Sequence, residues 1–236
     1  MQRRGFRGGG PPPRRRSTFS SVSRPDEHNR YYNELAGSSL HRLSGLSDGI
    51  FAVAMTLLVL ALAVPTTEGV KSDSDLWQAL LNLIPSLITY FMSFLTLGIF
   101  WVGQQTQLSQ LERSNRDFTW INLAFLLFVT LVPFSTSLLA SHLQLRLALI
   151  EYWLNILVLG VLILAAAEYA VRAGLFNQAN QATIIRAVRR RVYIAQSLYL
   201  LATLLCFIDT RLSIGVIVAV QLNYAIAPRI PILHRL

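Results

Sequence analysis

Six apolar segments limit what this chain can fold into. The first four are long enough to cross a hydrocarbon core as an α-helix, which takes about 20 residues, and the last two are shorter and separated only by Asp209–Arg211. Hydrophobic residues make up 53% of the 236 residues and charged residues only 14%, against about 25% charged residues in ordinary soluble domains. We therefore predict an all-α polytopic membrane protein with six transmembrane helices. The segments are Gly45–Val64, Trp77–Val102, Phe118–Ala140, Leu147–Val171, Val192–Ile208 and Leu212–Ala227.

The basic residues are divided unevenly between the two ends of these segments. Of the 21 Lys and Arg residues, all but Lys71, Arg146 and Arg211 fall in the N-terminal tail, the second and fourth connections or the C-terminal end. Since basic residues accumulate on the cytoplasmic side, this pattern predicts a multi-pass protein of the cell membrane with both termini in the cytoplasm. The net charge of +9 is then explained by topology and by contacts with anionic lipid headgroups, not by nucleic-acid binding.

Composition divides the chain into three parts. Residues 1–37 are rich in Gly, Pro, Arg and Ser and are predicted to be a disordered basic cytoplasmic tail. Residues 38–227 contain the six apolar segments, and residues 228–236 are predicted to be a short cytoplasmic end. The four histidines are scattered and the chain has one cysteine, so the sequence predicts no metal site and no catalytic constellation. We expect no enzyme activity and no cofactor.

Acidic residues are rare inside the apolar segments, where an ionisable side chain is costly and is by default a functional hypothesis. Glu151 and Glu168 lie near opposite ends of the fourth segment. We predict that each is an interfacial carboxylate or is paired with another helix.

Asp48 is the acidic residue of the first segment. Asp48 and Arg42 are six residues apart, too far for a pair on one helix face, so we expect each to bond to another helix. Ser47 is expected to help satisfy the Asp48 carboxylate. In the alternative interpretation, Ser44 or Ser47 caps the helix and the helix dipole favours Asp48.

One side of the first segment carries a stripe of small, apolar and hydroxyl side chains. Helical spacing places Gly49, Val53, Thr56 and Leu60 on this stripe. If copies of the stripe faced a common axis, Val53 and Leu60 would form hydrophobic constrictions with a ring of Thr56 hydroxyls between them, and such rings can gate by dewetting. The same residue types also suit a helix-packing seam, and periodicity alone leaves both interpretations open.

At these residues the sequence resembles the potassium channels of the transmembrane protein 175 family. Arg42 with Leu46-Ser47-Asp48 and the apolar run after it is similar to the family's first-helix signature, Arg-x-x-x-Phe-Ser-Asp. The second segment ends in Trp101-Val102-Gly103-Gln104, where the family usually has Trp-x-x-His. The third segment contains Asn122-Leu123 and Pro133-Phe134-Ser135, similar to the family's Asn-Leu and Pro-Phe-Ser pattern. The resemblance covers residues 38–227.

The resemblance implies a K⁺ channel whose first helices line the pore. The constriction is then Val53, with Thr56 and Leu60 as further pore-lining layers and Gly49 on the same face. A chain with one six-helix unit is expected to form a homotetramer, with K⁺ as the permeating ion and no cofactor. The structural motif that holds the pore helix is expected to be Arg42, Ser47 and Asp48, and the family-like packing positions are Trp101, Gln104, Asn122 and Pro133.

Three departures from the family pattern affect these expectations. Leu46 replaces the signature Phe, which is expected to change packing only. Gln104 replaces the usual His, so a His-dependent bonding network at this position is in question. Val53 is smaller than the expected Ile or Leu, which predicts a wider and less selective constriction.

Two other functions remain compatible with the residues themselves. In a secondary transporter or proton leak pathway, Asp48 and Glu168 could relay protons, although no internal repeat is evident in the sequence. In a structural membrane protein without transport, the stripe would be only a packing seam.

Overall fold

The protein is a bundle of long α-helices. The computed structural model describes residues 39–62, 64–65, 70–176 and 181–226. In these ranges the backbone is helical apart from turns, short connections and one antiparallel bridge between Leu111 and Phe176, which confirms the prediction of an all-α fold. The elements are α2 (Leu40–Leu57), the 3₁₀ helix η1 (Leu58–Ala61), α3 (Asp73–Asn82), α4 (Ile84–Leu108), α5 (Arg116–Ser141), α6 (Arg146–Arg172), α7 (Gln181–Leu204), η2 (Leu205–Phe207) and α8 (Thr210–Ile226).

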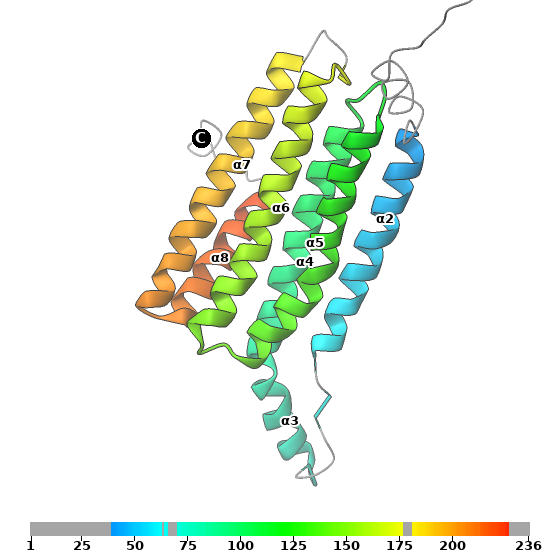
Figure 1. Cartoon of the computed structure of the whole chain (residues 1–236). Coiled ribbons are helices and arrows are strands. Elements are labelled where there is room, and N and C mark those ends of the chain that lie inside the picture. Colours follow the sequence, from blue (N-terminus) through cyan, green and yellow to red (C-terminus); the bar gives the residue numbers. More distant parts are fainter. Residues whose placement is uncertain (1–38, 63, 66–69, 177–180, 227–236) are drawn as a thin grey trace, which may run out of the picture.

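Figure 1 shows how the helices are arranged. The helices α2, α5, α6 and α7 lie side by side, α4 and α8 lie behind them, and α3 extends from one end of the bundle. Helix α2 is at the edge, where it packs on α4 and α5. The position of α2 leaves one of its faces without a partner in the described part of the chain.

Four helices are long and apolar enough to cross a membrane. They are Leu40–Ala61, Ile84–Leu108, Arg116–Ser141 and Arg146–Arg172, and they correspond to the first four predicted segments. The fifth and sixth segments correspond to α7 and α8, which pack on each other and within the bundle. The four candidate spans make the chain a multi-pass membrane protein. The predicted tail, residues 1–37, lies outside the described residues.

The predicted start of the second span is wrong. The segment Trp77–Val102 contains a helix boundary at Leu83, because Pro85 lies at the beginning of α4, where its missing N–H costs no helical hydrogen bond. Trp77 therefore lies on α3, where 62% of its surface is exposed, and the span continues to Leu108. The short helix has its own cap at Ser72. A hydrogen bond with the Ser72 hydroxyl, followed by one from the Lys71 N–H, holds the pKa of Asp75 below its usual range.

A polar cluster in the interior connects α8 to the rest of the bundle. The Gln221 amide donates to the Thr96 hydroxyl over 2.7 Å, and Thr96 lies 3.2 Å from the buried Tyr152 hydroxyl. Ser93 donates to the same Tyr152 oxygen. Buried polar groups are costly unless they are paired, so these bonds fix the position of α8 against α4 and α6.

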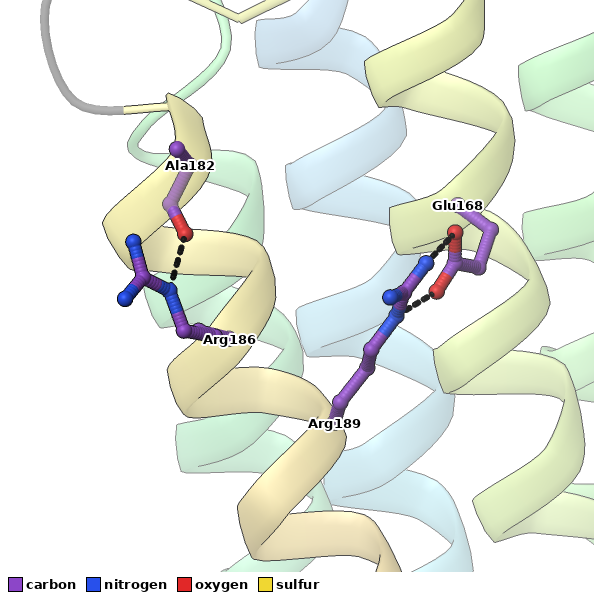
Figure 2. A network of polar contacts seen from close by, with 4 residues as sticks. All are labelled: Glu168, Ala182, Arg186 and Arg189. Carbon is purple, nitrogen blue, oxygen red and sulfur yellow. Dashed lines mark hydrogen bonds and ion pairs between the residues drawn. The ribbon is translucent and has the colours of Figure 1, made fainter.

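Both acidic residues of α6 are bonded to neighbouring helices. Glu168 forms an ion pair with Arg189 of α7, in which the second bond, from Nη2 to Oε2, measures 2.7 Å (Figure 2). Glu151 accepts a hydrogen bond from Ser135 of α5 over 2.9 Å. Of the two alternatives predicted for these carboxylates, an interfacial position or pairing with another helix, the structure shows the pairing.

One end of the bundle collects most of the described basic residues. The start of α2, the α4–α5 connection, the end of α6 and the start of α7 all lie there (Figure 1), and these segments contain Arg42, Arg113, Arg172 and the arginines of residues 186–191. We refer to it as the basic end. The opposite end holds the starts of α6 and α8.

Candidate functional site

The predicted stripe lies on the unpartnered face of α2. Val53 is 57% exposed and Leu60 76% exposed, and Gly49 and Thr56 are exposed as well. The Thr56 hydroxyl donates to the Val53 carbonyl over 2.8 Å, so its oxygen still has acceptor capacity toward the outside of the helix. The stripe does not serve as a seam within the described part of its own chain.

The opposite face of α2 anchors it to the bundle. Phe51, Ala54 and Leu58 are buried, and the Phe51 ring lies 6.1 Å from the Phe125 ring of α5, within the usual range for aromatic pairs. The bulky side chains therefore point inward, and the smaller side chains of the stripe remain available to another molecule.

The stripe changes helical geometry before it ends. Leu58–Ala61 form the 3₁₀ helix η1, in which each residue turns about 120° instead of 100°. Over the three steps from Leu57 to Leu60 this difference adds about 60°, so Leu60 is rotated away from the line of Val53 and Thr56. The same change turns Val59, which is half-exposed, toward that line. The prediction that Leu60 continues the stripe assumed an unbroken α-helix.

Asp48 connects α2 to α4. Its Oδ1 accepts hydrogen bonds from Trp101 Nε1 over 2.8 Å and from Gln105 Nε2 over 2.7 Å. The prediction that Asp48 bonds to another helix is thus confirmed. The capping alternative is wrong, because α2 begins at Leu40 and its cap is Ser39.

A second, buried chain of hydrogen bonds connects three helices. Ser47 donates to Gln104 Oε1, Gln104 Nε2 donates to Asn122 Oδ1 over 3.2 Å, and Asn122 donates to the Phe118 carbonyl over 2.9 Å. Ser47 therefore bonds Gln104, and the expectation that it supports the Asp48 carboxylate is wrong. Gln104 has both a donor and an acceptor, so it connects α2 to α5 without a histidine.

The structure does not join Arg42 to this cluster. Its backbone N–H donates to Ser39, but among the described residues its exposed guanidinium has no ion pair or hydrogen bond. Pro133 lies inside α5, and the helix continues through it from Arg116 to Ser141. In the same described ranges, no group of three or more His, Cys, Asp or Glu comes close enough together to hold a metal ion.

We refer to the hydrogen bonds of Ser44, Ser47 and Asp48 with α4 as the polar junction. Two of its members, Ser44 and Gln105, were not predicted as site residues. Gln105 bonds both Asp48 and the Ser44 hydroxyl, the latter over 3.0 Å. A signal for this role exists in the sequence, since Trp101, Gln104 and Gln105 have the spacing i, i+3, i+4 that places three polar groups on one helix face. The partner helix of that face could not be read from the same pattern.

Comparisons with known proteins identify similar channels. The sequence model of the family described as the endosomal/lysosomal potassium channel TMEM175 matches residues 42–133. A potassium channel of Chamaesiphon minutus is 33% identical over 193 residues, which cover 80% of this chain and 95% of that protein. A potassium channel of Streptomyces collinus is 33% identical over 179 residues, which cover 74% of this chain and 85% of that protein.

A solved structure has a similar fold. It is the crystal structure of a lysosomal potassium-selective channel TMEM175 homolog from Chamaesiphon minutus, which is 31% identical in sequence and covers 80% of this chain and 97% of its own. The TM-score is 0.70.

Proposed function

The chain belongs to the TMEM175 family, and we propose that it is a channel that conducts K⁺ passively across the cell membrane. The names of the bacterial relatives and of the solved structure support K⁺ as the permeating ion. The observation that carries the proposal is the exposed stripe on α2, an edge helix that is firmly anchored on its other face.

Helix α2 lines the pore, and Val53 forms its constriction. A ring of valine side chains offers no ligand to an ion, so K⁺ has to shed part of its hydration shell there, and the empty ring can close by dewetting. The Thr56 hydroxyls lie one turn further along and can contact the ion through their oxygens. Gly49 leaves room before the constriction, and the rotated Leu60 contributes a less direct apolar layer, together with Val59.

The polar junction holds α2 in place without contacting the ion. Asp48 and Ser47 fix α2 to α4 through separate hydrogen bonds, and Gln104 extends the second of these to α5. These residues are structural, as are Trp101 and Asn122. Arg42, which precedes them at the basic end, meets solvent or lipid headgroups.

The membrane domain has six spans within residues 38–227, of which α7 and α8 are the fifth and sixth. Helix α7 lies along α6 and is joined to it by the Glu168–Arg189 pair, and α8 is joined to α4 by the Gln221–Thr96 bond. An even number of spans puts both termini on the side of the basic end, which is the cytoplasmic side because it carries most of the arginines. Residues 1–37 and 228–236 are then cytoplasmic.

The pore requires several copies of the chain, because one chain supplies a single α2. We expect the purified protein in detergent to have four times the mass of one chain, with the α2 stripes facing each other. Native mass spectrometry or light scattering measures this directly. A stable monomer would contradict the pore assignment, since the stripe would then face only lipid.

Ion flux from liposomes tests the proposed function. With the purified protein in vesicles, we expect a K⁺ gradient to drive flux that grows linearly with the K⁺ concentration, as in passive conduction. Vesicles with only a H⁺ gradient serve as the second arm. Saturable flux that needs a counter-ion would support a secondary transporter, and proton flux without K⁺ flux would support a proton leak pathway. The absence of flux in both arms would support a structural protein. Each of these results would overturn the proposal.

A further inference from the structure

A cavity of 290 Å³ lies between α4, α6 and α7, away from the α2 stripe. Helix α6 packs against both α4 and α7 and forms its floor. The lining of α7 extends from Ile184 to Tyr199, or about 22 Å at 1.5 Å per residue. One leaflet of a hydrocarbon core is about 15 Å deep, so the cavity reaches from the basic end well into the membrane.

The lining is largely apolar, with polar groups at intervals along this length. Gln107 and Gln110 line the part near the basic end, where α4 ends, and Arg191 lies about midway along the lining of α7. The deeper part contains Ile99 and Phe100 together with the polar residues Thr96, Gln196 and Tyr199. A mainly apolar wall with one arginine suits a molecule with a charged head and a hydrocarbon chain.

Two glutamine side chains leave buried polar atoms unpaired on the wall of this cavity. Gln107 is only 4% exposed, and its Nε2 has no hydrogen-bond partner in the described structure. Gln196 donates to the Ile156 carbonyl over 3.2 Å, but its Oε1 is buried and also unpaired among the described residues. An unpaired buried amide is costly, and the Gln107 N–H can be satisfied by an ester or phosphate oxygen in the cavity.

The arginines of α7 differ in what they already bind. Arg189 is neutralised by Glu168, and Arg186 turns back to the Ala182 carbonyl of its own helix (Figure 2). Arg191 lines the cavity and has no carboxylate partner in the described ranges. Arg191 is the α7 arginine that lines this cavity, whereas Arg190 lines the space between α7 and α8, so Arg191 is placed to bind an anion in the cavity.

Arg191 also lines a second cavity, between α7 and α8. This cavity has a volume of 660 Å³ and contains Ile194, Leu198 and Tyr224 among its lining residues. An anionic group at Arg191 thus lies beside two largely apolar cavities on either side of α7, which suits a lipid with two acyl chains better than a single-chain fatty acid.

We propose that Arg191 and the cavity between α4, α6 and α7 bind an anionic phospholipid of the cytoplasmic leaflet. The phosphate binds Arg191, one acyl chain lies in the apolar part of this cavity, and the second chain lies between α7 and α8. Gln107, nearer the basic end, donates to an oxygen of the lipid headgroup. This site is separate from the proposed pore, and its occupancy is measured without any flux.

Native mass spectrometry of the delipidated full-length protein tests the site, with phosphatidylglycerol as the probe. We expect Arg191→Gln to bind about fivefold less of this lipid than the wild type, which is the effect of about 1 kcal/mol for one basic residue near the surface. Arg186→Gln is the matched control, because it removes the same charge from the same helix outside the cavity. Equal loss in both variants would overturn the proposal, since it would indicate general charge attraction.

Filling the cavity supplies an independent test. Ala195 lines it, and Ala195→Trp is expected to reduce phosphatidylglycerol binding roughly tenfold, because overpacking leaves no space for a chain. Leu201→Trp, at a 61% exposed position of the same helix, is expected to bind as the wild type does. Wild-type binding by Ala195→Trp, or equal wild-type binding of phosphatidylcholine, would overturn the proposal. Tighter binding of oleate than of phosphatidylglycerol would overturn the assignment to a phospholipid.

Discussion

Val53→Phe is expected to lower K⁺ flux roughly tenfold or more. An added barrier of about 1.4 kcal/mol is enough for a tenfold effect, and phenylalanine rings around a shared axis both narrow the constriction and extend its apolar length. Stopped-flow or electrode measurements of K⁺ efflux from liposomes give the rate, and planar-bilayer recordings give the conductance per channel. The expected loss depends on α2 facing the pore, because Val53 touches little else: 57% of its surface is exposed.

The control for this substitution is Val161→Phe. Val161 lies on α6 and is 54% exposed, so the same side-chain change is made at nearly the same exposure but on a helix that is not assigned to the pore. We expect K⁺ flux through this variant to stay close to that of the wild type. If both variants lose flux equally, the loss reflects folding or assembly, and Val53 is not the constriction.

Val53→Ala is the complementary change. A ring of alanines leaves a wider opening and presents less apolar surface, so water enters it more readily and K⁺ retains more of its hydration shell. We expect a higher conductance and a smaller preference for K⁺ over Na⁺, measured as a shift of the reversal potential in asymmetric solutions. An unchanged conductance together with an unchanged reversal potential would remove Val53 from the pore.

The apolar pattern predicted the ends of a helix best where the helix is apolar along its whole length. The third and fourth segments match α5 and α6 within two residues at each end, because both helices stay apolar throughout their length. Helix α7 begins at Gln181, well before the predicted start at Val192. Its first turns are rich in arginine and stand at the basic end, so hydropathy carries no signal for them, although their backbone is helical.

The site was predictable as a set of residues but not as a set of bonds. Periodicity placed Gly49, Val53 and Thr56 on one face, and the structure leaves that face exposed. The partner of Ser47 is Gln104 and not Asp48, because Ser47 points into the bundle and Asp48 toward the edge of α4. Which residue of α4 bonds Ser47 depends on the rotation of α2 about its own axis relative to α4. The residues around Ser47 in the sequence do not determine that rotation. The 3₁₀ turn at Leu58–Ala61 also has no marker in this apolar run.

Gln104→Leu is expected to have the largest effect on stability. Gln104 is 1% exposed, and removing its amide leaves the Ser47 hydroxyl and the Asn122 carbonyl oxygen buried without this partner. Hydrogen bonds between membrane helices average less than in water-soluble cores, so we expect a loss of about 1–3 kcal/mol for the two broken bonds. Thermal unfolding of the purified protein in detergent measures it, at about 2–4 °C for each kcal/mol. Gln110→Leu, at an exposed position in the turn that follows α4, is the control and should unfold within about 0.5 kcal/mol of the wild type.

Gln104→His distinguishes the bonding network from simple packing. A neutral imidazole accepts at one ring nitrogen and donates at the other, so it can accept the hydrogen bond from the Ser47 hydroxyl and donate one to Asn122 Oδ1, as the glutamine does. We expect this variant to retain most of the stability that Gln104→Leu loses. A double-mutant cycle completes the argument: Ser47→Ala combined with Gln104→Leu should cost less than the sum of the single changes, because both remove the same bond. Strict additivity would mean that Ser47 and Gln104 stabilise α2 independently, and the buried chain from α2 to α5 would then not be a unit.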